Sequence, residues 1–205
     1  MRRSMIISVA AVALALASFA SAAPRQIDVG NDFFDPRNPP ARSFSSGPSF
    51  RWSNGGGTSR PHNIRQDAKL FYSGPLTRGS INFTINASAG SYHYYCELHG
   101  TPDLGMQGTV KVRPIALADS PAGEVKVRWA GSDTNTGSRF DVRYRVDHRR
   151  WKTWRNDTRS FQGAFGHSDR PVNYRPRRHN YRIKVRSERR RVEKHSDWSP
   201  VLRLG

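Results

Sequence analysis

Sulfur-bearing residues are scarce in this chain, which has a single cysteine and three methionines among 205 residues. One cysteine excludes an intrachain disulfide framework and any zinc site that requires several thiolates. Long apolar runs are missing beyond the first 22 residues, so the rest of the sequence offers no segment of the roughly 20 residues that a membrane-spanning helix needs. The 17 glycines and 13 prolines are spread along the chain, and they predict many turns and no long helices.

Acidic residues are also few, because 16 Asp and Glu stand against 34 Lys and Arg, for a formal net charge of +18. A disordered basic tail would carry few aromatic rings, whereas this chain has 5 Trp, 7 Tyr and 10 Phe. The composition therefore predicts a packed fold. Its positive charge favours anionic partners.

Residues 1–22 have the three parts of a secretory signal peptide. The second and third residues are arginines, an apolar core runs from Met5 to Leu16, and a small-x-small cleavage pattern ends at Ala22. The alternative is an uncleaved anchor helix, but an apolar core of this length is short for a bilayer span. We therefore expect a cleaved leader, no membrane span after cleavage, and a secreted or periplasmic protein.

The remaining sequence divides into two parts of different charge. Residues 23–113 contain 10 Lys and Arg against 6 Asp and Glu, and residues 114–205 contain 22 against 10. Residues 114–123 (PIALADSPAG) have the composition of a short linker. We expect two domains, over residues 23–113 and 124–205, each large enough to fold independently.

Both parts contain segments in which apolar and polar residues alternate, as is typical of β-strands with one face in water. Such segments are centred on Phe83, Val110, Val127, Val142 and Ile183. Helical periodicity is found only in the leader. The sequence therefore predicts an all-β protein with two β-sandwiches in tandem.

The cysteine lies in a short segment that also holds a histidine and the last methionine. Cys96 precedes His99 by three residues and Met106 by ten, and His62 lies upstream in an Arg-Pro-His-Asn segment. Two imidazoles, one thiolate and a distant thioether are the ligands of a trigonal copper site with a weak axial sulfur. Loops at one end of a sandwich can bring such side chains to one point. We predict that His62, Cys96, His99 and Met106 bind one copper ion.

Several further motifs accompany this ligand set in the first part of the chain. They are Phe33-Phe34-Asp35-Pro36, Trp52-Ser53-Asn54, His62-Asn63, and Cys96-x2-His99-x6-Met106-Gln107-Gly108-Thr109-Val110. Together they make residues 25–113 similar to the plastocyanin-type cupredoxins, the small blue copper proteins. The resemblance implies a Greek-key β-sandwich, a type 1 copper ion and single-electron transfer, with His99 near the surface. It also implies that Asn63 braces the loop that bears His62, although the loop from His99 to Met106 is slightly longer than in plastocyanins.

Enzymes with related copper sites need further histidines. Multicopper oxidases and copper nitrite reductases have His-x-His pairs or a histidine beside the cysteine, whereas the seven histidines here form no such pair and Tyr95 precedes Cys96. We therefore expect an electron carrier without catalytic residues. His93 lies three residues before Cys96, so on a regular strand it points to the opposite face, and we interpret it as a surface or packing residue.

Two other functions stay open at this point. The protein could bind copper for trafficking or buffering outside the cytoplasm, without redox turnover. It could also be an adhesive pair of modules in which copper is incidental. The sequence does not identify a redox partner protein.

The aromatic residues of the second part follow a recognisable order. Trp129, Tyr144 and Trp151 lie on successive predicted strands, Tyr181 begins another, and Trp198-Ser199-Pro200 precedes the last. This order resembles a fibronectin type III module over about residues 121–205. Such sandwiches generally space, dock or bind rather than catalyse.

Many cations of the second part fall within a short stretch of sequence. They are Arg175, Arg177, Arg178, Arg182, Lys184, Arg186, Arg189, Arg190 and Arg191. They could form a positive face for an anionic cell-wall or extracellular polymer, nucleic acid or an acidic redox partner. Alternatively, they only solvate one sheet face and stack on Trp154 or Trp198. The sequence offers no groove-entering helix or base-stacking motif, which argues against sequence-specific nucleic-acid binding.

Overall fold

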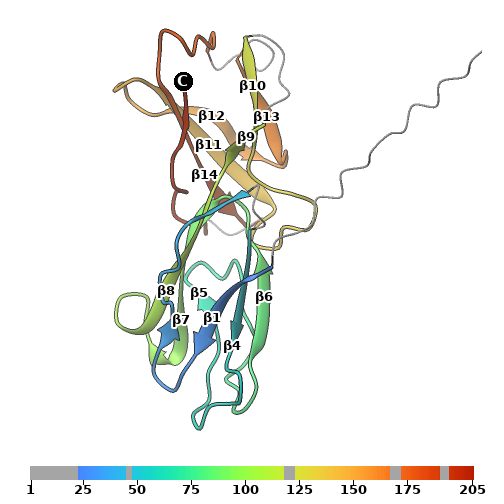
Figure 1. Cartoon of the computed structure of the whole chain (residues 1–205), viewed down its shortest axis with the longest axis vertical. Coiled ribbons are helices and arrows are strands. Elements are labelled where there is room, and N and C mark those ends of the chain that lie inside the picture. The colour runs from blue at the N-terminus through green and yellow to red at the C-terminus, as the bar shows by residue number, and fades with distance from the viewer. Residues whose placement is uncertain (1–22, 45–47, 118–122, 167–171, 190–193) are drawn as a thin grey trace, which may run out of the picture.

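The structure is a computed structural model that describes residues 23–44, 48–117, 123–166, 172–189 and 194–205. The predicted leader, half of the predicted linker, and the basic residues Arg190 and Arg191 lie outside these ranges. The described chain is all-β, as the sequence predicts, and its strands form four sheets (Figure 1). Over the same ranges, no helix is long and apolar enough to cross a membrane.

The first sandwich consists of two four-stranded sheets with the orders β2-β1-β4-β6 and β3-β8-β7-β5. The strands of one sheet are β1 (Arg25–Val29), β2 (Phe34–Asp35), β4 (Ser49–Ser53) and β6 (Asn82–Asn86). Those of the other are β3 (Arg42–Ser43), β5 (Arg65–Gln66), β7 (Gly90–Gly100) and β8 (Gly105–Arg113). β1 is parallel to β4 and β3 is parallel to β8, whereas the other neighbours are antiparallel.

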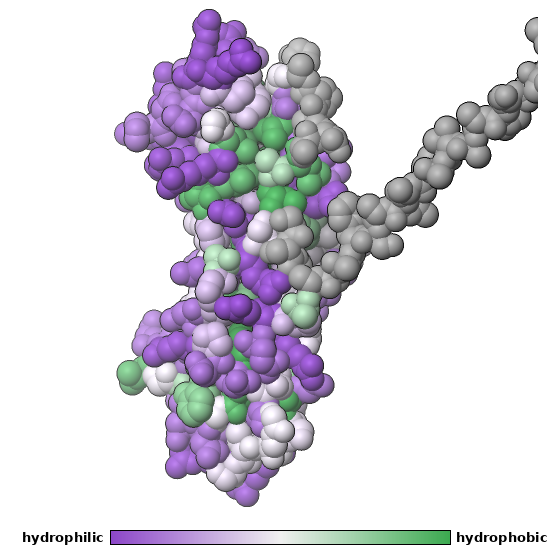
Figure 2. Space-filling model, viewed as in Figure 1, coloured by the Kyte–Doolittle hydropathy of each residue, from purple (hydrophilic) through white to green (hydrophobic). Residues whose placement is uncertain are grey.

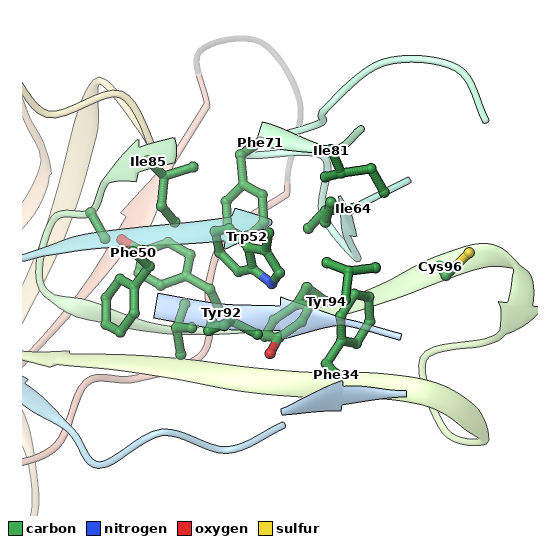
Figure 3. Packing of buried hydrophobic residues seen from close by; sticks show 14 of the residues in the cluster. Phe34, Phe50, Trp52, Ile64, Phe71, Ile81, Ile85, Tyr92, Tyr94 and Cys96 are labelled. Atoms are coloured by element: carbon green, nitrogen blue, oxygen red, sulfur yellow. The ribbon is translucent and has the colours of Figure 1, made fainter. Parts of the chain in front are cut away.

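Aromatic side chains fill the space between these two sheets (Figure 3). Trp52 of β4 and Tyr94 of β7 are fully buried, and their rings meet edge to face with centroids 5.0 Å apart. On β7, alternate residues point inward, so that Tyr92, Tyr94 and Cys96 all join this core. Figure 3 shows Cys96 at the end of the aromatic row, beside the turn between β7 and β8.

The second sandwich pairs a three-stranded sheet, β13-β10-β9, with a four-stranded sheet, β12-β11-β14-β15. The strands are β9 (Ile115–Ala116), β10 (Glu124–Arg128), β13 (Gln162–Gly166), β11 (Arg139–Val146), β12 (Lys152–Thr158), β14 (Tyr181–Glu188) and β15 (Leu202–Leu204). Its core contains Trp129, Phe140, Phe165 and Tyr181, all fully buried. Part of the predicted linker is thus a strand, because β9 pairs with β10.

A polar junction joins the two sandwiches where β7 begins. The main chains of Ser91 and Asp197 exchange two hydrogen bonds of 3.0 Å, and Ala89 N donates to the carbonyl of Trp129. The buried Tyr92 hydroxyl lies 2.8 Å from Ser187 Oγ of the second sandwich. Because these bonds include main-chain groups of both sandwiches, they fix one sandwich against the other.

Candidate metal centre

Three potential metal ligands meet at the end of the first sandwich. His62 Nδ1 lies 3.7 Å from Cys96 Sγ and 3.2 Å from His99 Nδ1, and Cys96 Sγ lies 3.6 Å from His99 Nδ1. His62 and Cys96 are buried, whereas His99 is partly exposed. The structure therefore brings together three of the four ligands that the sequence predicts, and this buried cluster could bind a metal ion.

An irregularity in the β7–β8 ladder allows Cys96 and His99 to face the same point. Residues three apart on a regular strand point to opposite faces. The ladder is regular up to the pair Tyr95–Gln107 and resumes only at Gly100–Gly105, so three extra residues are accommodated on β7. A bulge of this kind bends a strand and redirects its side chains. The loop that the sequence predicts between His99 and Met106 is correspondingly short, since β7 ends at Gly100 and β8 begins at Gly105.

Glycine is required where the ladder resumes. A Cβ atom on Gly100 would lie 2.6 Å from the carbonyl oxygen of Met106, closer than real Cβ atoms approach backbone. Gly105 has a φ of 80°, in the left-handed region that favours glycine. The two glycines therefore permit the close backbone approach that positions His99 and Met106 on the two arms of this hairpin.

Asn63 ties the segment of His62 to that of Cys96. Its Oδ1 accepts a hydrogen bond of 3.0 Å from Glu97 N, and its Nδ2 donates to Glu97 Oε2 at 2.6 Å and to the carbonyl of Gly74 at 3.3 Å. Asn63 is itself buried. Since Asn63 and Glu97 directly follow His62 and Cys96, these bonds hold the two ligand-bearing segments at a fixed separation.

Glu97 is a positioning residue that the sequence analysis does not identify. Besides Asn63, it bonds Arg65 and accepts a hydrogen bond from the hydroxyl of Tyr72 at 3.3 Å. The hydrogen bond from Arg65 is the main reason why the pKa of Glu97 is lowered, and the bond from Asn63 acts in the same direction. A carboxylate beside a predicted ligand is a weak signal in sequence, because its partners come from other segments.

The separations of the three donor atoms fit a single ion. One point lies about 2.0 Å from all three atoms, and roughly 2.0–2.3 Å is the range of metal–nitrogen and metal–sulfur bonds in zinc proteins. Burial is the main cause of a lowered pKa of His62, and the neighbouring His99 adds to it. The neutral imidazole is the form that binds a metal. The donor set is one thiolate and two imidazoles, which suits copper and zinc alike.

The fourth predicted ligand, Met106, lies on β8 and is 2% exposed. Its side chain belongs to the same core cluster as Cys96. A role as axial ligand stays a prediction. His93 is placed apart from the cluster, with Nδ1 3.0 Å from Asp67 Oδ2 and its other ring nitrogen beside Gln107.

Comparisons with known proteins assign no family to the chain. No protein-family model matches it, and no curated protein sequence matches it. One similar solved structure is described as "Cytokine receptor complex - Crystal form 1A". The two share 20% sequence identity, the match covers 71% of this chain and 85% of that one, and the TM-score is 0.33. A similarity at this level carries no argument about function.

Proposed function

We propose that the protein is an exported single-electron carrier whose cofactor is one type 1 copper ion. The observation that carries the proposal is the convergence of His62 Nδ1, His99 Nδ1 and Cys96 Sγ within 3.7 Å of one another. Two imidazoles and a thiolate are the in-plane ligands of blue copper electron-transfer sites, which add a weak axial sulfur. The sequence supplies a suitable thioether, Met106, and the resemblance to the cupredoxins supports the same proposal.

Bound copper would supply one-electron chemistry by alternating between its two common oxidation states. His62, Cys96 and His99 would hold the ion, and Met106 would tune its potential. Because His62 and Cys96 are buried, their side chains would exclude water from the core side of a bound ion. The Asn63–Glu97 hydrogen bonds would keep the ligands in place, so that the site rearranges little when its charge changes.

The electron would pass through the partly exposed imidazole of His99, because the other two donors are buried. Two apolar side chains near it in sequence, Leu98 and Leu104, are 52% and 75% exposed. Covering apolar side chains costs little desolvation, which suits a transient contact with a redox partner protein. The second sandwich would serve as a docking or tethering unit, and the predicted leader would direct the protein to the periplasm or the medium.

Copper trafficking or buffering is the alternative function. A thiolate site also retains Cu(I), so the ligand set alone does not require redox turnover. The two functions differ in what the oxidised protein does. A carrier holds copper in both oxidation states, whereas a trafficking protein holds Cu(I) and surrenders it to an acceptor.

Copper titration of the protein without its leader tests the proposal. We expect one equivalent of Cu(II) to produce an intense visible thiolate-to-copper band that ascorbate bleaches and a mild oxidant restores. The Cys96→Ala variant should lack the band. His93→Gln, which changes a histidine outside the cluster, is the matched control and should keep it.

Two results would contradict the proposal. A colourless protein that holds Cu(I) and releases it to a chelator would favour trafficking. A Cys96→Ala variant that still shows the blue band would exclude Cys96 as the ligand.

A further inference from the structure

Two groups of cations in the second sandwich have different surroundings. One group stacks on the indole rings of Trp151 and Trp198, which lie just outside the strands of the four-stranded sheet. Lys184 Nζ lies 4.4 Å from the ring centre of Trp151, and the guanidinium carbons of Arg143 and Arg186 lie 4.9 and 5.0 Å from that of Trp198. These cation–π contacts hold the stacked side chains against the sheet face. Lys184 and Arg186 therefore follow the stacking alternative of the sequence analysis.

The other group lies at the end of the sandwich, on two turns and at the first residue of β12. It consists of Arg149, Arg150, Lys152, Arg175, Arg177 and Arg178, all exposed. Within the described part of the chain, none of these six side chains forms an ion pair. We call these six residues the basic tip. Figure 2 shows hydrophilic residues gathered over this end of the molecule.

Hydrogen bonds hold the turn that carries Arg175. The buried Tyr181 hydroxyl accepts a hydrogen bond from Arg175 N at 2.9 Å and donates to the carbonyl of Asn173 at 3.1 Å. Arg178 N closes the turn by donating to the carbonyl of Arg175. The position of Arg175 is thus determined by a core residue rather than by the surface.

Asp147 connects this turn to the β11–β12 turn that carries Arg149 and Arg150. Its carboxylate accepts from Asn180 N at 3.0 Å and contacts His179 Nδ1 at 2.9 Å. The hydrogen bond from Asn180 is the largest cause of the lowered pKa of Asp147, followed by His179. The carboxylate of Asp147 is therefore already hydrogen-bonded within the protein, and it joins the two turns into one cradle.

A pocket of about 350 Å³ lies between the two turns. Arg149, Arg150, Lys152 and Arg175 line it, and its described lining contains no acidic residue. Ligand pockets in proteins commonly have volumes of roughly 300–1,000 Å³, so there is room for a phosphate and part of a sugar. One guanidinium group can donate two parallel hydrogen bonds to two oxygens of a phosphate.

We propose that the basic tip binds the phosphate monoester groups of an anionic polysaccharide. A phosphate monoester carries about −1.5 to −2 charges at neutral pH, compared with one for a carboxylate, and four cations around one pocket match the larger charge. The basic tip and the β7–β8 turn lie at opposite ends of the molecule (Figure 1), so a polymer bound at the tip leaves His99 accessible. This inference specifies the docking role proposed above and does not depend on copper.

Fluorescence anisotropy with labelled dextran phosphate tests this inference on the protein without its leader. Arg150→Gln with Arg175→Gln removes two pocket cations. The matched control, Arg128→Gln with Arg159→Gln, removes the same charge from other exposed positions of the second sandwich. We expect the tip variant to weaken binding at least tenfold and to lower the slope of log Kd against log salt by about 1 to 2. The control should change the affinity less than about threefold.

Four outcomes would overturn the inference. An equal loss of affinity in the tip variant and the control variant would mean that binding depends on the net charge of the protein and not on the basic tip. Undiminished binding after phosphatase treatment of the dextran, or equal binding of carboxymethyl dextran, would exclude phosphate specificity. Tighter, tip-dependent binding of duplex DNA or of anionic lipid vesicles would assign the tip to a different partner. Since all variants keep the copper ligands, their blue band reports separately on the proposed electron-transfer function.

Discussion

The side chain of Asn63 hydrogen-bonds both the main chain and the carboxylate of Glu97, at 3.0 Å and 2.6 Å. Each of these residues directly follows a member of the metal-ligand cluster. The pair therefore links the segments of His62 and Cys96 without occupying either donor atom. Arg65 bonds the other carboxylate oxygen of Glu97, Oε1, and the Tyr72 hydroxyl donates to Oε2, as Asn63 does.

Removing this link should loosen the metal site. For Asn63→Ala we expect copper affinity to fall by roughly 10- to 100-fold, because residues that orient metal ligands have effects of this size. The blue band should persist at saturating copper, since all ligands remain. Competition with a chelator measures the affinity. Asn82→Ala, which removes an exposed amide that bonds Arg51, is the control. Wild-type affinity in Asn63→Ala would show that the link does not support the site.

Met106→Leu should keep the blue colour and raise the reduction potential. A thioether donates electron density to the oxidised ion, and leucine of similar size cannot, so the reduced form gains relative stability. We expect a rise on the order of 59 mV, which corresponds to a tenfold change in the equilibrium of a one-electron couple. Spectroelectrochemistry measures the shift. An unchanged potential would show that Met106 is not the axial ligand.

The stability of the second sandwich should depend on the ionisation of Glu188. Burial raises the pKa of Glu188 from 4.5 to about 7, and the nearby carboxylate of Asp141 adds to the effect. Arg186 makes shorter bonds to Asp141, at 2.7 and 2.9 Å, than to Glu188, at 3.5 Å. Asp141 therefore holds the cation, and Glu188 is the carboxyl group that keeps its proton.

A carboxyl group whose pKa rises on folding stabilises the fold below its unfolded pKa, and this contribution is lost as the pH rises through the folded value. Between pH 4.5 and about 7, the free energy of unfolding of the wild type should therefore fall relative to that of Glu188→Gln. The expected difference is about 1–3 kcal/mol. Urea unfolding of the metal-free proteins across this range measures it. Asp28→Asn, at an exposed position, is the control, and parallel pH profiles for wild type and Glu188→Gln would contradict the prediction.

Tyr92→Phe should destabilise the junction between the sandwiches. The hydroxyl group contacts Ser88 Oγ at 2.7 Å, Ser187 Oγ at 2.8 Å and Thr136 Oγ1 at 3.1 Å, all in a fully buried position. Its loss removes the hydrogen bond of the buried Ser187 hydroxyl across the junction, at a cost of about 1–3 kcal/mol, whereas the hydroxyls of Ser88 and Thr136 keep their mutual contact of 3.2 Å. Chemical denaturation measures this change. Tyr174→Phe, which removes the same hydroxyl group from a tyrosine outside the junction, is the control, and it should lower the free energy of unfolding by less than about 0.5 kcal/mol.

The period-two patterns predicted the strands well, because alternation reflects which face of a strand is buried. The segments around Phe83, Val110, Val142 and Ile183 are strands β6, β8, β11 and β14. Composition marked residues 114–123 as a linker, and within that range Ile115 and Ala116 form β9 and pair with β10. Strand pairing depends on a partner elsewhere in the chain, and local composition does not contain that information.

The placement of the basic residues was also only partly predictable from the sequence. A cluster in sequence suggested one positive face, whereas Lys184 and Arg186 stack on Trp198 and Arg189 donates to the carbonyl of Lys69 in the first sandwich. Among the described members of this cluster, Arg175, Arg177 and Arg178 lie together on one exposed turn, and Arg189 is exposed elsewhere. Alternation along β14 and the direction of each turn decide which cations are free, and neither follows from charge counting.

The sequence by itself determined the all-β class and three residues that meet at the candidate metal centre, because burial patterns and rare soft ligands are local properties of the chain. Tertiary structure alone decided that an irregularity in β7 turns Cys96 and His99 toward one point, since the register of β7 on β8 sets it. It also decided that Glu97 supports the centre and that six cations form a tip at the far end. These relations join segments distant in the chain, and only the folded packing places them together.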